Sequence, residues 1–85
     1  METVINEYIS RELVSKPELL PLENDSSLLE SGILDSIAVL KLVFFLEEQF
    51  GVAVAAEDLV PENFETVNTI CAYLHAEQHA QQARK

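Results

Sequence analysis

The feature that most constrains this chain is residues 36–50, an unbroken segment that contains neither glycine nor proline. Asp35 precedes the segment and belongs to the residue types favoured at helix N-caps. Gly51 follows it, and glycine is favoured just beyond the end of a helix. Leucine, valine and phenylalanine fill much of the interior. These signals predict a helix over residues 36–50, with both ends marked by the sequence.

The rest of the chain also favours helices over strands. Two glycines and three prolines in 85 residues are too few turn residues for a sheet protein of this size. Apolar residues at helical spacing predict a first helix over residues 3–15, with Thr3 as its N-cap. A last helix is predicted after Thr66, on which Cys71 falls in the apolar stripe. Between the second and last helices, residues 57–64 predict a short helical turn interrupted at Pro61.

A long connection, residues 16–34, joins the first two helices. It carries seven leucine or isoleucine side chains: Leu19, Leu20, Leu22, Leu28, Leu29, Ile33 and Leu34. A structureless loop of this length is unusual in a compact domain, so several of these side chains must pack onto the core. The predicted fold is therefore all-α, a small antiparallel bundle of three main helices plus one short helix, with a long loop between helices 1 and 2. Residues 1–78 are predicted to form the domain and residues 79–85 a polar C-terminal tail.

The charge excludes some functions. Fifteen acidic and five basic residues give a formal net charge of −10 at pH 7. Binding to nucleic acid or to an anionic membrane needs lysine and arginine, so we expect neither kind of binding. We expect partners with basic surfaces instead. The longest apolar run, residues 42–46, is too short to span a membrane, and no signal peptide is visible. Together with a single cysteine, these features predict a cytoplasmic monomer without an internal disulfide.

Residues 36–50 carry two apolar faces, one more than a bundle helix needs. The first face suffices for the core and contains Val39, Leu42, Val43, Leu46 and Phe50. The second lies roughly opposite and contains Ile37, Leu40 and Phe44, flanked by Lys41, Glu47 and Glu48. Either the long loop covers the second face through Leu28 or Leu34, or that face is an exposed partner surface ringed by charge.

Ser36 stands at the predicted first position of the same helix. A phosphate bound there would be favoured by the helix dipole and by free backbone N–H groups, although Asp-Ser is also a common way to begin a helix. The surrounding stretch, LLESGILDSI over residues 28–37, resembles the phosphopantetheine attachment motif of acyl and peptidyl carrier proteins. The resemblance continues through the leucine-bearing loop, residues 47–51 and residues 66–70. Asp25-Ser26 opens no long helix and lacks this context.

The resemblance implies a carrier rather than an enzyme. A phosphopantetheinyl transferase would move 4′-phosphopantetheine from coenzyme A onto the Ser36 hydroxyl, beside Asp35, with Mg²⁺ supplied by the transferase site. The thiol of the arm would then hold an acyl or aminoacyl group as a thioester and pass it between biosynthetic enzymes. No catalytic constellation and no metal site of its own are predicted. The alternative is an unmodified helical interaction module that uses the Ile37, Leu40 and Phe44 patch.

The resemblance also implies which residues bind partners. In this family the second helix contacts partner enzymes, and the corresponding positions here are Ile37, Leu40, Lys41, Phe44, Glu47 and Glu48. The chain has Ala38 and Lys41 where carriers of fatty-acid synthesis usually have acids, which implies a specialised pathway of nonribosomal peptide or polyketide type. Residues 59–64 resemble free-standing carriers that are loaded by an adenylating enzyme. Downstream acyl-processing enzymes would be further partners.

Three other features have simpler interpretations. His75 and His79 have the spacing of a two-histidine metal pair, but no third ligand is apparent, so we expect solvent-exposed side chains near a helix end. Cys71 is expected in the core. The acidic residues between positions 57 and 65 are expected to be a solvated charge run rather than a cation site.

Overall fold

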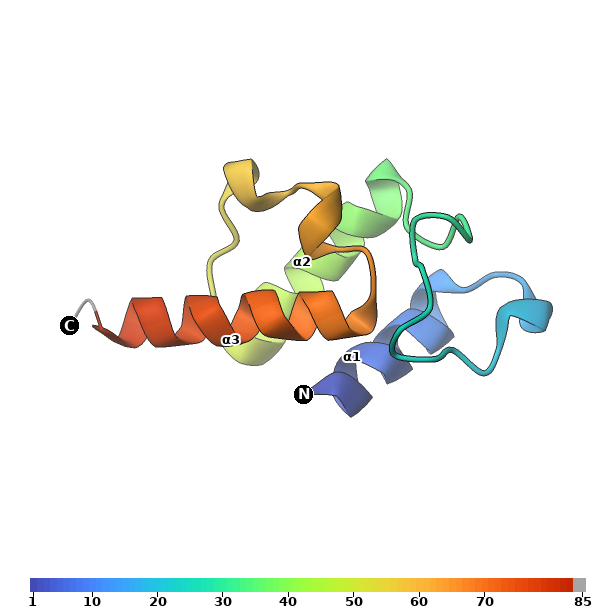
Figure 1. Ribbon diagram of the computed structural model, residues 1–85, viewed down its shortest axis with the longest axis horizontal. Coiled ribbons are helices and arrows are strands. Elements are labelled where there is room, and N and C mark those ends of the chain that lie inside the picture. Colours follow the sequence, from blue (N-terminus) through green and yellow to red (C-terminus); the bar gives the residue numbers. More distant parts are fainter. Residues whose placement is uncertain (84–85) are drawn as a thin grey trace.

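A computed structural model describes residues 1–83 of the chain. Its three α-helices are α1 (Glu2–Tyr8), α2 (Ser36–Phe50) and α3 (Val67–Ala83), and no strand occurs within that range. Four shorter helical turns lie between them: η1 (Ile9–Leu13), η2 (Pro17–Leu19), η3 (Ala56–Asp58) and η4 (Pro61–Asn63). In Figure 1, α2 passes behind α3, and the segment with η3 and η4 lies above them. The predicted all-α class is confirmed.

The second and third helices begin where the sequence predicts. Asp35 caps α2, because its Oδ1 accepts the N–H of Ala38 at 2.8 Å. Gly51 ends this helix with φ of 67°, a left-handed conformation that glycine adopts without steric cost, and its N–H donates to the carbonyl of Glu47 at 3.0 Å. Thr66 caps α3, since its Oγ1 accepts the N–H of Thr69 at 3.0 Å.

The first helix differs from the prediction at both ends. It begins at Glu2 with Met1 in the N-cap position and no side-chain cap, so the assignment of Thr3 as the cap was wrong. Its last turn is the wider π-helical η1, closed by a hydrogen bond from the N–H of Val14 to the carbonyl of Ile9 at 3.0 Å. Val14 is already extended, which ends the helix before the predicted residue 15.

The predicted short helix over residues 57–64 is two separate 3₁₀ turns, η3 and η4. Pro61 explains the break, because it has no backbone N–H and pushes the preceding residue out of the helical region. Val60 is indeed extended, with ψ of 152°. The segment therefore crosses the surface as a compact, irregular strap rather than as a fourth helix of the bundle.

Backbone hydrogen bonds hold the long loop against the helices. The N–H of Leu28 donates to the carbonyl of Glu65 at 2.7 Å, and the N–H of Asn68 donates to the carbonyl of Asn24 at 3.0 Å. These bonds tie the loop to the start of α3. From α1, the Asn6 side chain donates to the carbonyl of Leu22 at 2.8 Å. The loop is thus fixed in place, and with it the backbone that leads into α2.

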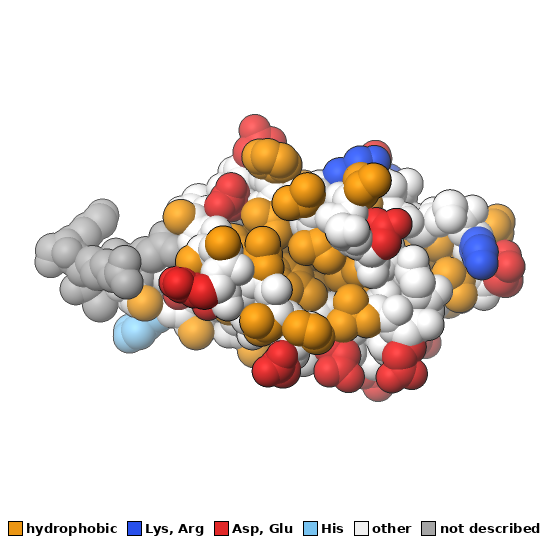
Figure 2. All heavy atoms as spheres, turned by 90° about the horizontal axis from the view of Figure 1, so that it is seen from above, with side chains coloured by type: hydrophobic (Ala, Val, Ile, Leu, Met, Phe, Trp, Pro, Cys, Tyr) orange, Lys and Arg blue, Asp and Glu red, His pale blue; other side chains and the backbone are white. Residues whose placement is uncertain are grey.

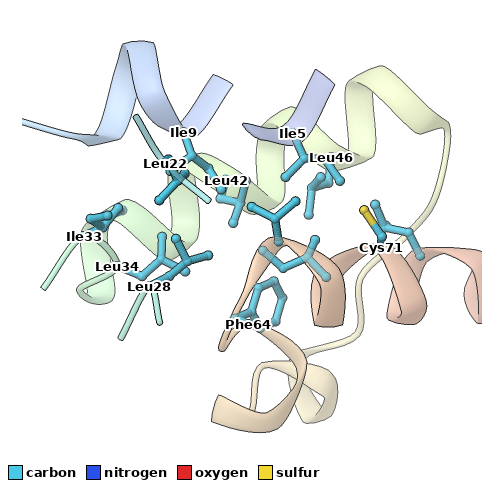
Figure 3. Packing of buried hydrophobic residues seen from close by; sticks show 14 of the residues in the cluster. Ile5, Ile9, Leu22, Leu28, Ile33, Leu34, Leu42, Leu46, Phe64 and Cys71 are labelled. Atoms are coloured by element: carbon cyan, nitrogen blue, oxygen red, sulfur yellow. The ribbon is translucent and has the colours of Figure 1, made fainter. Parts of the chain in front are cut away.

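A single hydrophobic cluster joins the helices and the loop (Figure 3). The helices contribute Ile5, Ile9, Ala38, Leu42, Leu46, Val67, Ile70, Cys71 and Leu74, and the connections contribute Leu22, Leu28, Ile33, Leu34, Val52 and Phe64. The predicted burial of loop leucines is confirmed for several of them, although Leu20 remains exposed. Cys71 is a core residue as predicted, and burial raises the pKa of its thiol. Val39, Val43 and Phe50 from the predicted core face are half-buried and pack against the cluster.

The end of α3 bears on the predicted C-terminal tail. Helix α3 continues to Ala83, so it includes most of the predicted tail, and residues 84 and 85 lie outside the described part of the chain. The boundary at residue 78 stays a prediction. None of the described helices has the length and apolar character that a membrane span requires.

Candidate functional site

Ser36 is exposed at the first position of α2. At this position the N–H groups of Ser36 and Ile37 precede the first intrahelical hydrogen bonds and have no acceptor within the helix. The N–H of Ala38 is already bound by Asp35. The hydroxyl of Ser36 therefore stands in solvent at the positive end of the α2 dipole, where a phosphodiester is electrostatically favoured.

An apolar cleft of about 260 Å³ opens beside Ser36. The start of α2, the end of the long loop and the strap with η4 enclose it. Its lining residues are Leu29, Leu34, Asp35, Ser36, Val39, Leu59, Val60, Pro61 and Phe64. Figure 2 shows this face of the molecule, with hydrophobic side chains gathered around a hollow near its centre. No sequence pattern predicted the cleft, because its walls come from three segments that only the fold brings together.

The second apolar face of α2 is exposed. Ile37, Leu40 and Phe44 have 67%, 54% and 69% of their surface accessible. Leu28 and Leu34, the two loop residues that would have covered this face, are instead buried in the core. The interpretation of this face as packing beneath the loop was therefore wrong. We call Ile37, Leu40 and Phe44 the α2 patch.

The charged residues predicted around the α2 patch differ in exposure and in hydrogen bonding. Lys41 and Glu48 are exposed. No carboxylate within residues 1–83 lies in ion-pair distance of the Lys41 ammonium group. Glu47, in contrast, is half-buried, and its Oε2 accepts the N–H of Val54 at 2.9 Å. The Glu47 carboxylate thus ties the connection after α2 to the end of that helix, a structural role that the sequence did not indicate.

The histidine pair does not belong to a larger ligand set. His75 and His79 are exposed on α3, and the described part of the chain holds no group of three or more histidine, cysteine or acidic side chains placed to bind a metal ion. Asp58, one of the acids of the predicted charge run, instead accepts a hydrogen bond from the Tyr73 hydroxyl at 2.9 Å. Burial, and then this bond, raise the pKa of Tyr73. That contact anchors η3 to α3.

Comparison with known proteins identifies the family. Residues 7–74 match the family described as the phosphopantetheine attachment site. A search of curated proteins finds no match. Among solved structures, the chain resembles one titled "Crystal structure of FAD-dependent dehydrogenase", with 31% sequence identity and a TM-score of 0.74, covering 82% of this chain and 97% of that chain.

This protein belongs to the phosphopantetheine attachment site family. It is a carrier domain and not a catalyst, and it bears a covalently attached 4′-phosphopantetheine. Carriers of this kind interact with phosphopantetheinyl transferases and with enzymes that process acyl groups. The residues at the start of α2 fit such a group, since they offer an accessible hydroxyl, two unpaired N–H groups and an adjoining apolar cleft.

Proposed function

We propose that Ser36 is the residue that carries the 4′-phosphopantetheine arm. The observation that supports this most strongly is its position, exposed at the first residue of α2, with Asp35 before it as the N-cap. When bound, the arm supplies a thiol that holds an acyl or aminoacyl group as a thioester. The protein contributes the hydroxyl, the electrostatic environment of the phosphodiester and the surface that partner enzymes contact.

Intact-mass spectrometry tests this assignment. The protein is incubated with coenzyme A, Mg²⁺ and a broad-specificity phosphopantetheinyl transferase, and its mass should increase by one phosphopantetheinyl group. Ser36→Ala should abolish the increase. Ser26→Ala is the matched control, because Ser26 also follows an aspartate but lies in the loop, and this variant should be modified normally. An unmodified parent protein, or a modified Ser36→Ala variant, would contradict the assignment.

We further propose that the α2 patch and the neighbouring Lys41 and Glu48 contact the partner enzymes. The patch is apolar, exposed and starts one residue after Ser36, so an enzyme that receives the arm would cover it. Glu47 is the weakest of the predicted partner residues, because its carboxylate is already hydrogen-bonded to Val54. Lys41 gives this face a cation that the overall charge of −10 would not suggest. Rim charges of this kind act mainly on association rate and partner choice.

A charge placed in the patch tests the docking proposal. Phe44→Glu should leave the circular dichroism spectrum unchanged and lower the rate at which the transferase modifies Ser36. Leu20→Glu is the matched control. Like Phe44, Leu20 is a large hydrophobic side chain that is exposed, with 43% of its surface accessible, but it lies on the long loop. The proposal fails if both variants react at the parental rate. Binding of a partner that is unaffected by Ser36→Ala would favour the alternative, an unmodified interaction module.

The pathway that we propose is a specialised one of nonribosomal peptide or polyketide type, in which an adenylating enzyme loads the arm. Two features support it: the departure from the fatty-acid-synthesis pattern at Ala38 and Lys41, and the resemblance of residues 59–64 to free-standing carriers. In the structure four of those six residues, Leu59, Val60, Pro61 and Phe64, form one wall of the cleft beside Ser36. The test is to supply the modified carrier with ATP, an adenylating enzyme and a panel of amino and organic acids. Loading by fatty-acid enzymes alone would contradict the proposal.

The similar solved structure suggests one further partner, a flavin-dependent dehydrogenase that acts on the thioester. The match covers 97% of the similar chain with 82% of this one, which is about 70 of 85 residues, so the two chains have comparable length. A dinucleotide-binding fold requires a parallel sheet, and residues 1–83 form none. We therefore infer that a chain of this fold accompanies a flavin enzyme rather than binding FAD itself.

Such an enzyme would take two hydrogens from the carried acyl group, one as a proton and one as a hydride that reduces the flavin. Carrier protein isolated from its source cells should then contain two thioesters that differ in mass by two hydrogens. Mass spectrometry of the intact carrier resolves that difference. A single cargo without an oxidised counterpart would count against this partner, while leaving the role of Ser36 untouched.

A further inference from the structure

We propose that Lys41 and Glu48 set the direction in which the enzyme that loads the arm docks on the α2 patch. That enzyme presents a carboxylate opposite Lys41 and a basic side chain opposite Glu48. This inference rests on the proposed contact between the patch and partner enzymes. It goes further because it states the charge at each end of the enzyme's docking surface, and it places an acid, not a base, at the end nearer Ser36.

The two charges border the α2 patch at different levels of the helix. Lys41 is one helical turn beyond Ile37 and shares its side of α2. Glu48 is one turn beyond Phe44 and shares the same exposed side. Lys41 and Glu48 are seven positions apart in the sequence, which is about 10 Å along the helix axis. Followed from Ser36, this side of α2 therefore presents a cation, then an aromatic ring, then a carboxylate.

Both charged groups are free to contact a partner. Lys41 and Glu48 are exposed, and neither forms an ion pair within residues 1–83. Glu12 and Asp35 line a groove together with Lys41, but their carboxylates lie beyond ion-pair distance of its ammonium group. The third charged residue of α2 is Glu47, and its carboxylate is already hydrogen-bonded to the backbone beyond the helix. The free charges of α2 are thus one cation and one anion.

Contacts with α1 hold the part of α2 that carries the cation. The Tyr8 hydroxyl donates to the carbonyl of Lys41 at 3.3 Å, and the Tyr8 ring stacks on Phe45 with the ring centroids 4.0 Å apart. Leu42, the residue after Lys41, has none of its surface accessible. The backbone beneath Lys41 is therefore fixed, and a single helix sets the spacing between the two charges. An enzyme meets them at a defined separation.

The order of the charges gives the patch a direction that its apolar residues lack. Ile37 and Phe44 are both large and exposed, so an apolar groove could accept the patch either way round. Only one orientation brings Ser36 to the place where the enzyme receives the arm. In the reversed orientation Lys41 would meet the basic side chain of the enzyme and Glu48 its carboxylate, and such like-charge contacts oppose docking. The net charge of −10 cannot make this selection, because it attracts basic surfaces without regard to orientation.

Charge-swap kinetics test the proposal. The probe is the enzyme that loads the parent carrier with an amino or organic acid, and each variant is first modified at Ser36 and checked by intact mass. Lys41→Glu should lower kcat/KM for loading by about fivefold or more, although it makes the carrier more acidic. Glu48→Lys should lower it as well. The double variant Lys41→Glu/Glu48→Lys keeps the parental net charge and should be the slowest of the three.

Lys16→Glu is the matched control, because it makes the same change in net charge at an exposed position on the long loop. Its kcat/KM should stay within about twofold of the parental value. Circular dichroism confirms that each variant is folded. Faster loading of Lys41→Glu would show a basic surface opposite Lys41 and overturn the inference. A double variant that reacts at the parental rate would also overturn it, since only net charge would then matter. Failure of the parent to be modified at Ser36 would instead remove the proposed function.

Discussion

Two side chains that lie two residues apart on α2 allow a strong test of its two faces. Leu46 has none of its surface accessible and Phe44 has 69% accessible. Each is changed to alanine, a substitution that keeps the helix and removes the apolar group. If α2 lies as described, the two variants should differ greatly in free energy of unfolding, although both lose a large hydrophobic side chain.

The expected magnitudes follow from burial. Leu46→Ala removes buried methyl groups and leaves a cavity, which costs about 2–5 kcal/mol. Phe44 buries only about a third of its surface, and complete burial of such a side chain is worth about 1.5–3 kcal/mol, so its truncation costs roughly 0.5–1 kcal/mol. Alanine recovers about 0.5 kcal/mol because it has the higher helix propensity. The net cost of Phe44→Ala should therefore lie within about 0.5 kcal/mol of zero.

Urea denaturation followed by circular dichroism measures both values. With an m-value of about 1 kcal/mol per molar urea, typical of a small domain, Leu46→Ala should lower the midpoint by about 2 M or more. The midpoint of Phe44→Ala should move by less than about 0.5 M. Equal destabilisation by the two substitutions would refute the assignment of Phe44 to an exposed face, and with it the α2 patch.

Three further outcomes are expected. Asp35→Ala removes the cap bond to Ala38 and should cost about 1 kcal/mol, seen as a fall in Tm of about 4–8 °C; Asp35→Asn should retain most of that stability. Because burial and the bond to Asp58 raise the pKa of folded Tyr73, the unfolded chain loses this proton first, so stability should fall as the pH rises above about 10, and less so in Tyr73→Phe. Native apo protein should show no thiol that reacts with Ellman's reagent, since Cys71 is buried and the pKa of its thiol is raised. The loaded protein should show the thiol of the arm alone. Fast reaction of the native apo protein would contradict the burial of Cys71.

Local signals account for the features that the sequence predicted well. The bounds of α2 follow from Asp35 and Gly51, because capping and left-handed termination depend on residue types at fixed positions. The same holds for Thr66 at the start of α3. At the start of α1 the local signal misled, since Thr3 is a common capping residue, yet the helix begins one residue earlier without a side-chain cap.

The candidate site also combines residues that local sequence patterns identify with residues whose role depends on the tertiary structure. Ser36 could be singled out from the sequence, because its position at a helix start and the surrounding motif are both local patterns. Whether Phe44 was covered could not be decided from the helix alone, since that depends on where the loop places Leu28 and Leu34. The role of Glu47 was also hidden, because its partner Val54 lies beyond the end of the helix.

The sequence by itself determined an all-α fold, the limits of its central helix and the serine at the start of that helix, because each depends on neighbours within a few positions. The tertiary structure decided which face of α2 stays in water and created the cleft beside Ser36. Both depend on contacts between segments far apart in the chain. The bond from Leu28 to Glu65 joins the loop to the start of α3, and the loop, the strap and α2 together enclose a space that none of them encloses alone.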